Sequence, residues 1–282
     1  MTGNDESAND AFTPTDVLGL FQQLFDRANA RIDEVQQVAV EPGSAVAQHD
    51  AELRVRSYQE TLTLLISSAF DHVRLCAASV RALQGVLPFA TATPIRTSIT
   101  VGATALWLLD GEPDDRRLRT LQYWHADFCH MHDALKEQAK DNEAGWSSGM
   151  RQSSEVSQRV IKERLAKLRG NARDFGHTRA TLTDQRSDTK MVFDAGRYLE
   201  PDIFNGRDPK IELSRQWRIL SGHAHGRRWA LEGGIAYGEA DANGWGELRL
   251  EASLLDMFGY CLTAHTLAEA ALTRYKNLAS GS

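Results

Sequence analysis

The chain has 282 residues, of which 42% are hydrophobic and 25% charged, so it can bury a sizeable core as a globular protein does. Its net charge of −6 argues against a dedicated, sequence-reading DNA-binding protein with a basic face. The charge is uneven, however. Residues 1–60 carry eleven acidic residues against four arginines, whereas residues 151–180 carry eight Lys and Arg residues against three acidic ones. A basic second half permits contact with a phosphate backbone without requiring it.

Residues 1–12 are polar, small and acidic, and are expected to be disordered. They hold neither a basic region nor an apolar region of the kind found in secretory signal peptides. The three cysteines are widely spaced and form no CxxC pair, which indicates reduced thiols in a cytoplasmic protein. The most apolar stretch, Ile99 to Leu109, is too short to cross a bilayer, so no membrane contact is expected.

Residues 13–282 are expected to form a single helical domain. Thr13-Pro14-Thr15-Asp16 predicts the start of the first helix, because capping residues precede an apolar repeat of three-four spacing. A break at residues 41–44 ends it, and a long second helix is predicted over about 45–87. A third helix is predicted from Thr93-Pro94 to Leu109. Its second half is apolar on nearly every side, which favours a central position in the bundle.

Further helices are predicted, in chain order, over about 114–140, 154–168, 209–225 and 252–277. Residues 170–209 are rich in Gly, Asp, Arg and Thr and are expected to form an irregular insert. Residues 229–250 alternate weakly and contain Gly-Gly and Asn-Gly pairs, which permits a small β-hairpin. The sequence thus predicts an all-α bundle of six to seven helices.

The segment 217–228, Trp-Arg-Ile-Leu-Ser-Gly-His-Ala-His-Gly-Arg-Arg, concentrates groups that recognise phosphate and move protons. Arg218 and His225 are seven residues apart, so on a continuous helix they would share a face, with Ser221 between them. His223 would lie on a different side of that helix, unless the helix ended just before it. The spacing alone therefore leaves open which histidine faces the arginine.

Such a set suits the cleavage of a phosphodiester. A guanidinium offers several donors in a fixed fork to a phosphate, and an imidazole can take a proton from a ribose 2′-hydroxyl near neutral pH. That reaction needs no metal, and no cofactor is expected. The alternative is structural: basic side chains near a helix C-terminus can simply satisfy its last carbonyl groups.

The run from Trp217 to His225 resembles a signature of certain helical bacterial proteins, in which an aromatic residue is followed after two residues by Leu-Ser and then by a nearby His. Those proteins are related to the HEPN superfamily (higher eukaryotes and prokaryotes nucleotide-binding). The stretch from Pro94 to Asp110 is also similar to a buried helix of that group, in which an arginine precedes a glutamate by four residues. Here Arg96 is present, but Thr100 takes the place of the glutamate.

The resemblance implies a function. Many HEPN proteins are metal-independent ribonucleases with an arginine and a histidine separated by four to six residues, and many act as dimeric toxins or phage-defence effectors. On this likeness Arg218 would bind the phosphate, and His223 or His225 would be the acid or base. RNA, a second copy of the chain and a regulatory protein are the expected partners. Ile219 departs from the family, in which a polar residue often follows the arginine.

A second group of candidate residues lies in the fourth predicted helix. His125 and His132 interrupt an apolar stripe of three-four spacing, with Cys129 between them. If they faced Arg96 or Arg218 across the bundle, the two histidines would enlarge one substrate-binding site. Together with Cys129 they would also form a weak zinc set, although one helix rarely supplies a full coordination shell, and no metal is expected. Buried histidines that only bond to a neighbouring helix are the structural alternative.

Two main hypotheses follow. In the first, the protein is a HEPN-like, RNA-directed ribonuclease with Arg218, His223 and His225 as catalytic residues and Ser221 among the residues that bind substrate. In the second, it is a non-catalytic interaction or ligand-binding module. Its buried polar cluster would then combine Arg96, His125, His132 and Arg218.

Overall fold

The computed structural model describes residues 12–141, 145, 147–231, 235–240, 243, 246–250 and 252–281, most of which are helical. In chain order the helices are α1 (Pro14–Gln36), α2 (Ala45–Glu52), α3 (Tyr58–Leu83), α4 (Pro88–Leu109), α5 (Pro113–Asp141), α6 (Ser148–Asp174), α7 (Arg179–Thr183), α8 (Asp188–Ala195), the 3-10 helices η1 (Gly196–Tyr198) and η2 (Pro201–Phe204), α9 (Pro209–Ala224), α10 (Arg228–Leu231) and α11 (Leu254–Ala279). Strands β1 (Ile235–Ala240) and β2 (Gly246–Leu250) form an antiparallel hairpin. The predicted all-α fold class is confirmed. The disorder expected of residues 1–12 falls almost wholly outside the described residues.

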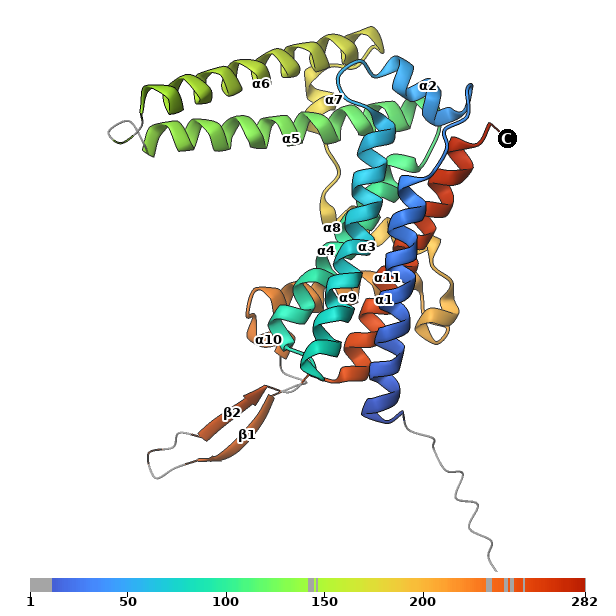
Figure 1. Ribbon diagram of the computed structural model, residues 1–282, viewed down its shortest axis with the longest axis vertical. Helices are drawn as coiled ribbons and strands as arrows, with labels where there is room; N and C mark the ends of the chain where they lie inside the picture. The colour runs from blue at the N-terminus through green and yellow to red at the C-terminus, as the bar shows by residue number, and fades with distance from the viewer. Residues whose placement is uncertain are drawn as a thin grey trace, which may run out of the picture.

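Helices α1, α3, α4 and α11 lie side by side and form the body of the bundle (Figure 1). Helix α4 contacts α3, α11, α8 and α9, because its second half is apolar on every side. Each residue from Gly102 to Leu109 is buried, as the sequence predicts for a central helix. Burial of one large apolar side chain contributes roughly 1.5–3 kcal/mol, so this helix anchors its neighbours.

Helices α5 and α6 pair into an arm that projects from one end of the bundle, and the β-hairpin projects from the other end (Figure 1). The first half of α5 packs on the bundle, where the indole Nε1 of Trp124 donates to Thr61 Oγ1 at 3.0 Å. In the hairpin Ile235 pairs with Leu250, and the register shifts between Tyr237 and Ala240. None of the helices in the described part of the chain is both long and apolar enough to span a membrane.

The long helix predicted over 45–87 is wrong, because the chain breaks into α2 and α3. The side chain of Asp50 causes this break by accepting hydrogen bonds from the backbone. Asp50 Oδ1 accepts hydrogen bonds from the backbone of Tyr58 at 2.5 Å and of Gln59 at 3.2 Å, which fixes the chain as it enters α3. Ser57 caps the new helix by accepting from the backbone of Glu60 at 3.0 Å. Both residues are typical capping residues, which satisfy the free N–H groups of a first turn.

Three further predictions on element boundaries need correction. Helix α4 begins at Pro88, not Thr93, and carries Pro94 in its interior. Helix α6 extends well beyond the predicted range 154–168 at both ends. The insert 170–209 is not irregular, since it contains the end of α6 and then α7, α8, η1 and η2. Short helices like these lack the long apolar repeat that makes a helix visible in a sequence.

Candidate functional site

The Arg218 segment occupies the second half of α9, and a specific turn ends that helix. Asp208 caps the N-terminus by accepting from the backbone of Lys210 at 2.8 Å. At the other end Gly226 takes a left-handed φ of +61°, and the backbones of Gly226 and Arg227 donate to His223 and Gly222 at 3.0 and 2.8 Å. This double bond pattern is a Schellman motif, in which glycine is favoured. His225 is therefore the cap residue, placed just outside the helix.

Arg218, Ser221 and His225 line one groove on the surface of α9, with a volume of about 560 Å³. Its wall also contains Arg215, Arg227 and Trp229. We call this the α9 groove. The face predicted from the spacing of Arg218, Ser221 and His225 is thus present, although the last of these residues reaches it from the cap and not from the helix.

His223 is not among the residues that line the α9 groove. Its half-buried ring lies close to the backbones of Ala230 and Pro88. Burial lowers the pKa of His223, and hydrogen bonds to the Ala230 and Pro88 backbones oppose this shift only in part. Among the described residues, no well-aligned hydrogen bond reaches its Nδ1. The imidazole is thereby directed toward the interior, so the two histidines of the motif have different surroundings.

Gly222 allows α10 to lie directly against α9. A Cβ at this position would stand 2.3 Å from the Ala230 Cβ and 3.0 Å from the Trp229 ring. Because glycine has no side chain, α10 can approach closely and hold the 55% exposed Trp229 at the wall of the groove. The close approach of α10 therefore gives the α9 groove its aromatic wall.

The α9 groove carries an arginine charge, that of Arg218, which no carboxylate among the described residues neutralises. Arg218 is exposed, and no carboxylate in the described part of the chain forms an ion pair with it. By contrast, Arg215 bonds to Glu212 at 2.8 Å. A second hollow, of about 560 Å³, adjoins the groove and shares both arginines with it. The exposed Phe193 and Lys190 of α8 line this hollow.

Arg96 does not reach the groove but lies behind it. Its guanidinium stacks 5.1 Å from the centre of the Trp217 ring, and the Trp217 indole donates to Thr100 Oγ1 at 2.9 Å. Thr100 thus links α4 to α9. Arg96 supports the groove through Trp217, which lines it, and is not itself at the surface where a substrate would bind.

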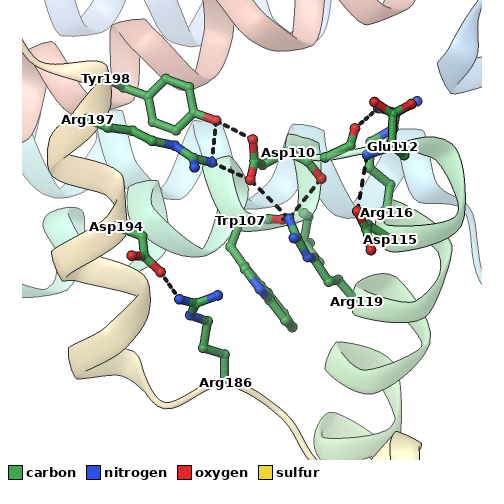
Figure 2. Close-up of polar contacts among 12 residues, drawn as sticks. Trp107, Asp110, Glu112, Asp115, Arg116, Arg119, Arg186, Asp194, Arg197 and Tyr198 are labelled. Atoms are coloured by element: carbon green, nitrogen blue, oxygen red, sulfur yellow. Dashed lines mark hydrogen bonds and ion pairs between the residues drawn. The ribbon is translucent and has the colours of Figure 1, made fainter.

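A network of charged residues attaches α8 and η1 to the end of α4 (Figure 2). The Asp110 carboxylate accepts from Tyr198 Oη at 2.8 Å, forms an ion pair with Arg197 and lies 3.2 Å from Arg119. Burial raises the pKa of Asp110, but the bonds from Tyr198, Arg197 and Arg119 more than offset this and lower it to about 2. We call these four residues the Asp110 joint. It lines part of a small cavity of about 150 Å³, and it holds η1, which directly follows α8, at the end of α4.

His125 and His132 lie on α5, in the arm, and do not line the α9 groove. Burial and the charges of Arg169 and Arg179 lower the pKa of His125. His132 Nδ1 is 3.6 Å from Asp133. The predicted enlargement of one polar site by these histidines is wrong, because the arm holds them against α6 and α7. In the part of the chain that the structure describes, no three His, Cys, Asp or Glu residues are grouped to hold a metal ion.

Sequence reasoning missed Trp229 in the wall of the α9 groove and Phe193 in the adjoining hollow. Their exposure depends on tertiary packing, so the local sequence carried no clear signal for either residue. Comparison with protein-family models, curated proteins and solved structures found no match to this chain.

Proposed function

We propose that the chain is a HEPN-like, RNA-directed protein with metal-independent endoribonuclease chemistry in the α9 groove. The single observation that supports this most is the meeting of Arg218, Ser221 and His225 along one groove. Arg218 has no carboxylate partner among the described residues, so its fork of donors remains available to a phosphate.

In this proposal each groove residue has a stated role. Arg218 binds the scissile phosphate, and Ser221 donates a hydrogen bond to one of its oxygens. His225 takes the proton of the ribose 2′-hydroxyl, because its exposed imidazole lines the groove and can reach a bound substrate as a general base. The 2′-oxygen then forms a bond to phosphorus while the bond from phosphorus to the 5′-oxygen breaks. The leaving oxygen takes a proton from water, which yields a cyclic phosphate end and a 5′-hydroxyl end.

The surroundings of the groove favour RNA over a small phosphorylated molecule. Trp229 and Phe193 expose aromatic surface on which unpaired bases can stack, and such stacking contributes roughly 1–3 kcal/mol per base. Arg227 adds a further positive charge to the wall of the groove, whereas Arg215 is paired with Glu212. Two adjoining hollows that share Arg215 and Arg218 offer room for more than one nucleotide.

The alternative function, a ligand-binding module with one buried polar cluster, is less well supported. It requires Arg96, His125, His132 and Arg218 to lie together. Arg218 is exposed, Arg96 stacks on Trp217, and both histidines belong to the arm.

The test is cleavage of single-stranded RNA by the purified full chain in EDTA, with wild type, Arg218→Ala and Arg151→Ala compared at equal concentration. Arg151 is an exposed arginine of α6, so its variant loses the same charge away from the groove. We expect wild type and Arg151→Ala to cleave, and Arg218→Ala to lose roughly 100-fold or more, because one donor to the reacting phosphate contributes that much. Unreduced cleavage by Arg218→Ala, or intact RNA in every reaction, would overturn the proposal.

A further inference from the structure

A second concentration of positive charge lies where α6, α7 and α5 meet, in the arm and apart from the α9 groove. A pocket of about 330 Å³ is lined there by Arg169, Arg173, His177, Thr178, Arg179 and Leu182. None of these residues lines the α9 groove. We call it the junction pocket.

Local backbone geometry builds this pocket from a short stretch of sequence. Arg169 and Arg173 are four residues apart on α6 and so lie on one face of its last two turns. Gly176 then takes a left-handed φ of +77°, and the backbone of His177 donates to Ala172 at 2.9 Å. This turn reverses the chain and brings Arg179, the first residue of α7, back toward α6.

Helix α7 is tied down at its far end, so the pocket has a fixed wall. The Gln122 amide on α5 donates to the backbone carbonyls of Thr181 at 2.6 Å and Asp184 at 3.1 Å. Leu182 is buried and supplies an apolar surface beside the arginines. The walls of the pocket therefore come from two helices that α5 holds in place.

The arginine charges of the junction pocket have no carboxylate counterpart in the part of the chain that the structure describes. No carboxylate in the described ranges lies within ion-pair distance of Arg169, Arg173 or Arg179. The contrast with a nearby arginine is direct: Arg54 pairs with Asp174, the residue next to Arg173. The half-buried Arg169 also has a buried Nε with no hydrogen-bond partner. Burying a guanidinium donor without an acceptor is costly, and an anion bound in the pocket would supply that acceptor.

The positive charges of Arg169 and Arg179 also act on His125, the neighbouring histidine on α5. Burial, and then the charges of Arg169 and Arg179, lower the pKa of His125. Three guanidinium groups around one hollow suit an anion that carries more than one charge.

We propose that the junction pocket binds a phosphate group, held by the forks of Arg169, Arg173 and Arg179. Phosphate presents three or more acceptor oxygens, and arginine matches its geometry with paired donors. The volume exceeds that of a free phosphate ion and leaves room for an attached sugar against Leu182. The phosphate can come from a small nucleotide or from an RNA backbone, and the experiment separates these sources.

Isothermal titration calorimetry of the full chain at low salt, in buffer free of phosphate and sulfate, tests the proposal with three probes: inorganic phosphate, adenosine 5′-monophosphate and a short single-stranded RNA. Wild type is compared with Arg169→Ala and Arg179→Ala. Arg159→Ala is the matched control, because Arg159 is an exposed arginine of α6 that does not line the pocket. The groove variant Arg218→Ala is included so that the two sites are separated.

We expect inorganic phosphate to bind wild type and Arg159→Ala alike, and to bind the junction pocket of Arg169→Ala and Arg179→Ala at least 10-fold more weakly. Arg218→Ala removes the proposed groove site and should keep the binding that belongs to the junction pocket. In that variant, tighter binding of the nucleotide than of the RNA would identify a small phosphorylated ligand, and the reverse would identify an RNA backbone. Circular dichroism melting checks that each variant is folded, and the exposed Arg179 serves if Arg169→Ala unfolds. No binding of any probe, or equal binding by Arg179→Ala and Arg159→Ala, would overturn the proposal. None of these readouts depends on RNA cleavage, so they stand apart from the proposed ribonuclease activity.

Discussion

His225 and His223 are two residues apart in the chain but have different chemical surroundings. His225 follows the last residue of α9 and is exposed in the α9 groove, whereas His223 turns toward the backbones of Ala230 and Pro88. A proton-transfer role requires contact with the substrate, so the proposed function assigns it to His225 alone. His223 instead helps to hold α10 against α9, through its hydrogen bond to the Ala230 backbone.

We predict that the two histidine variants separate activity from stability. His225→Ala should lower RNA cleavage roughly 100-fold or more, since a positioned acid or base contributes that much, and should change the free energy of unfolding by less than about 0.5 kcal/mol. His223→Ala should lower the free energy of unfolding by about 1 kcal/mol, because it removes bonds to the backbone. Cleavage rates and urea denaturation of both variants check this. An equal loss of cleavage in the two would contradict the assignment.

Part of this site could be predicted from the sequence. The spacing of Arg218 and Ser221 places both on one helix face, and this follows from helix geometry alone. The position of His225 depends on the left-handed turn at Gly226, which a glycine permits but does not require. The contribution of Trp229 depends on how closely α10 approaches Gly222, a tertiary contact with no signature in the local sequence.

At the scale of elements, Gly222 sets the distance between α9 and α10. Gly222→Ala should lower the free energy of unfolding by about 1–3 kcal/mol, because its new Cβ would overlap Ala230 and force the helices apart. Gly259→Ala in α11 is the matched control. Nothing lies within 4 Å of a Cβ there, so the same substitution should stabilise the helix by up to about 1 kcal/mol. Thermal melting of both variants tests the opposite signs.

The Asp110 joint should matter more than a surface ion pair. Asp110→Asn weakens the bonds to Arg197 and Arg119 in a half-buried setting that solvent partly screens, so a loss of about 1–2 kcal/mol is expected. Because the folded pKa of Asp110 is lowered to about 2, its contribution is present above pH 4 and is lost as the pH falls toward 2. Asp71→Asn, in the exposed pair with Arg74, should cost less than about 1 kcal/mol. Equal effects in urea denaturation at pH 7 would argue against a special role for the joint.

The ends of helices could be predicted only where the residues that set them are close together in the sequence. The start of α1 follows from a capping box of Thr13 and Asp16, whose groups bond within one turn. The break between α2 and α3 instead needs Asp50 to reach the backbone of Tyr58, eight residues away. Helices α7 and α8 are too short to show an apolar repeat, and their stability comes from packing on α5 and α4.

At the scale of the whole molecule, the fold class was predictable while the arrangement was not. Apolar spacing identifies the long helices, and the apolar second half of α4 predicts its central position, which the structure confirms. Nothing in that spacing indicates that α5 and α6 leave the bundle as an arm. The arm separates His125 and His132 from Arg218, and it places the junction pocket apart from the α9 groove in a chain whose net charge is −6.

The buried histidines predict how the stability of the whole molecule depends on pH. Burial lowers the pKa of both His125 and His265, although Glu269 opposes the shift of the latter. In the unfolded chain these imidazoles take up protons near pH 6.5, so the unfolded state binds more protons than the folded one as the pH falls below that value. Stability should therefore fall from pH 7.5 to 5, by up to about 1.4 kcal/mol per pH unit for each histidine that stays neutral when folded. This pH range, from 7.5 to 5, is separate from the range below pH 4 in which the contribution of Asp110 is lost.

Urea denaturation at several pH values tests this prediction. The free energy of unfolding should depend less steeply on pH in His265→Gln than in wild type, and as steeply as in wild type in the exposed control His130→Gln. A free energy of unfolding that stays constant or rises toward pH 5 would contradict the prediction.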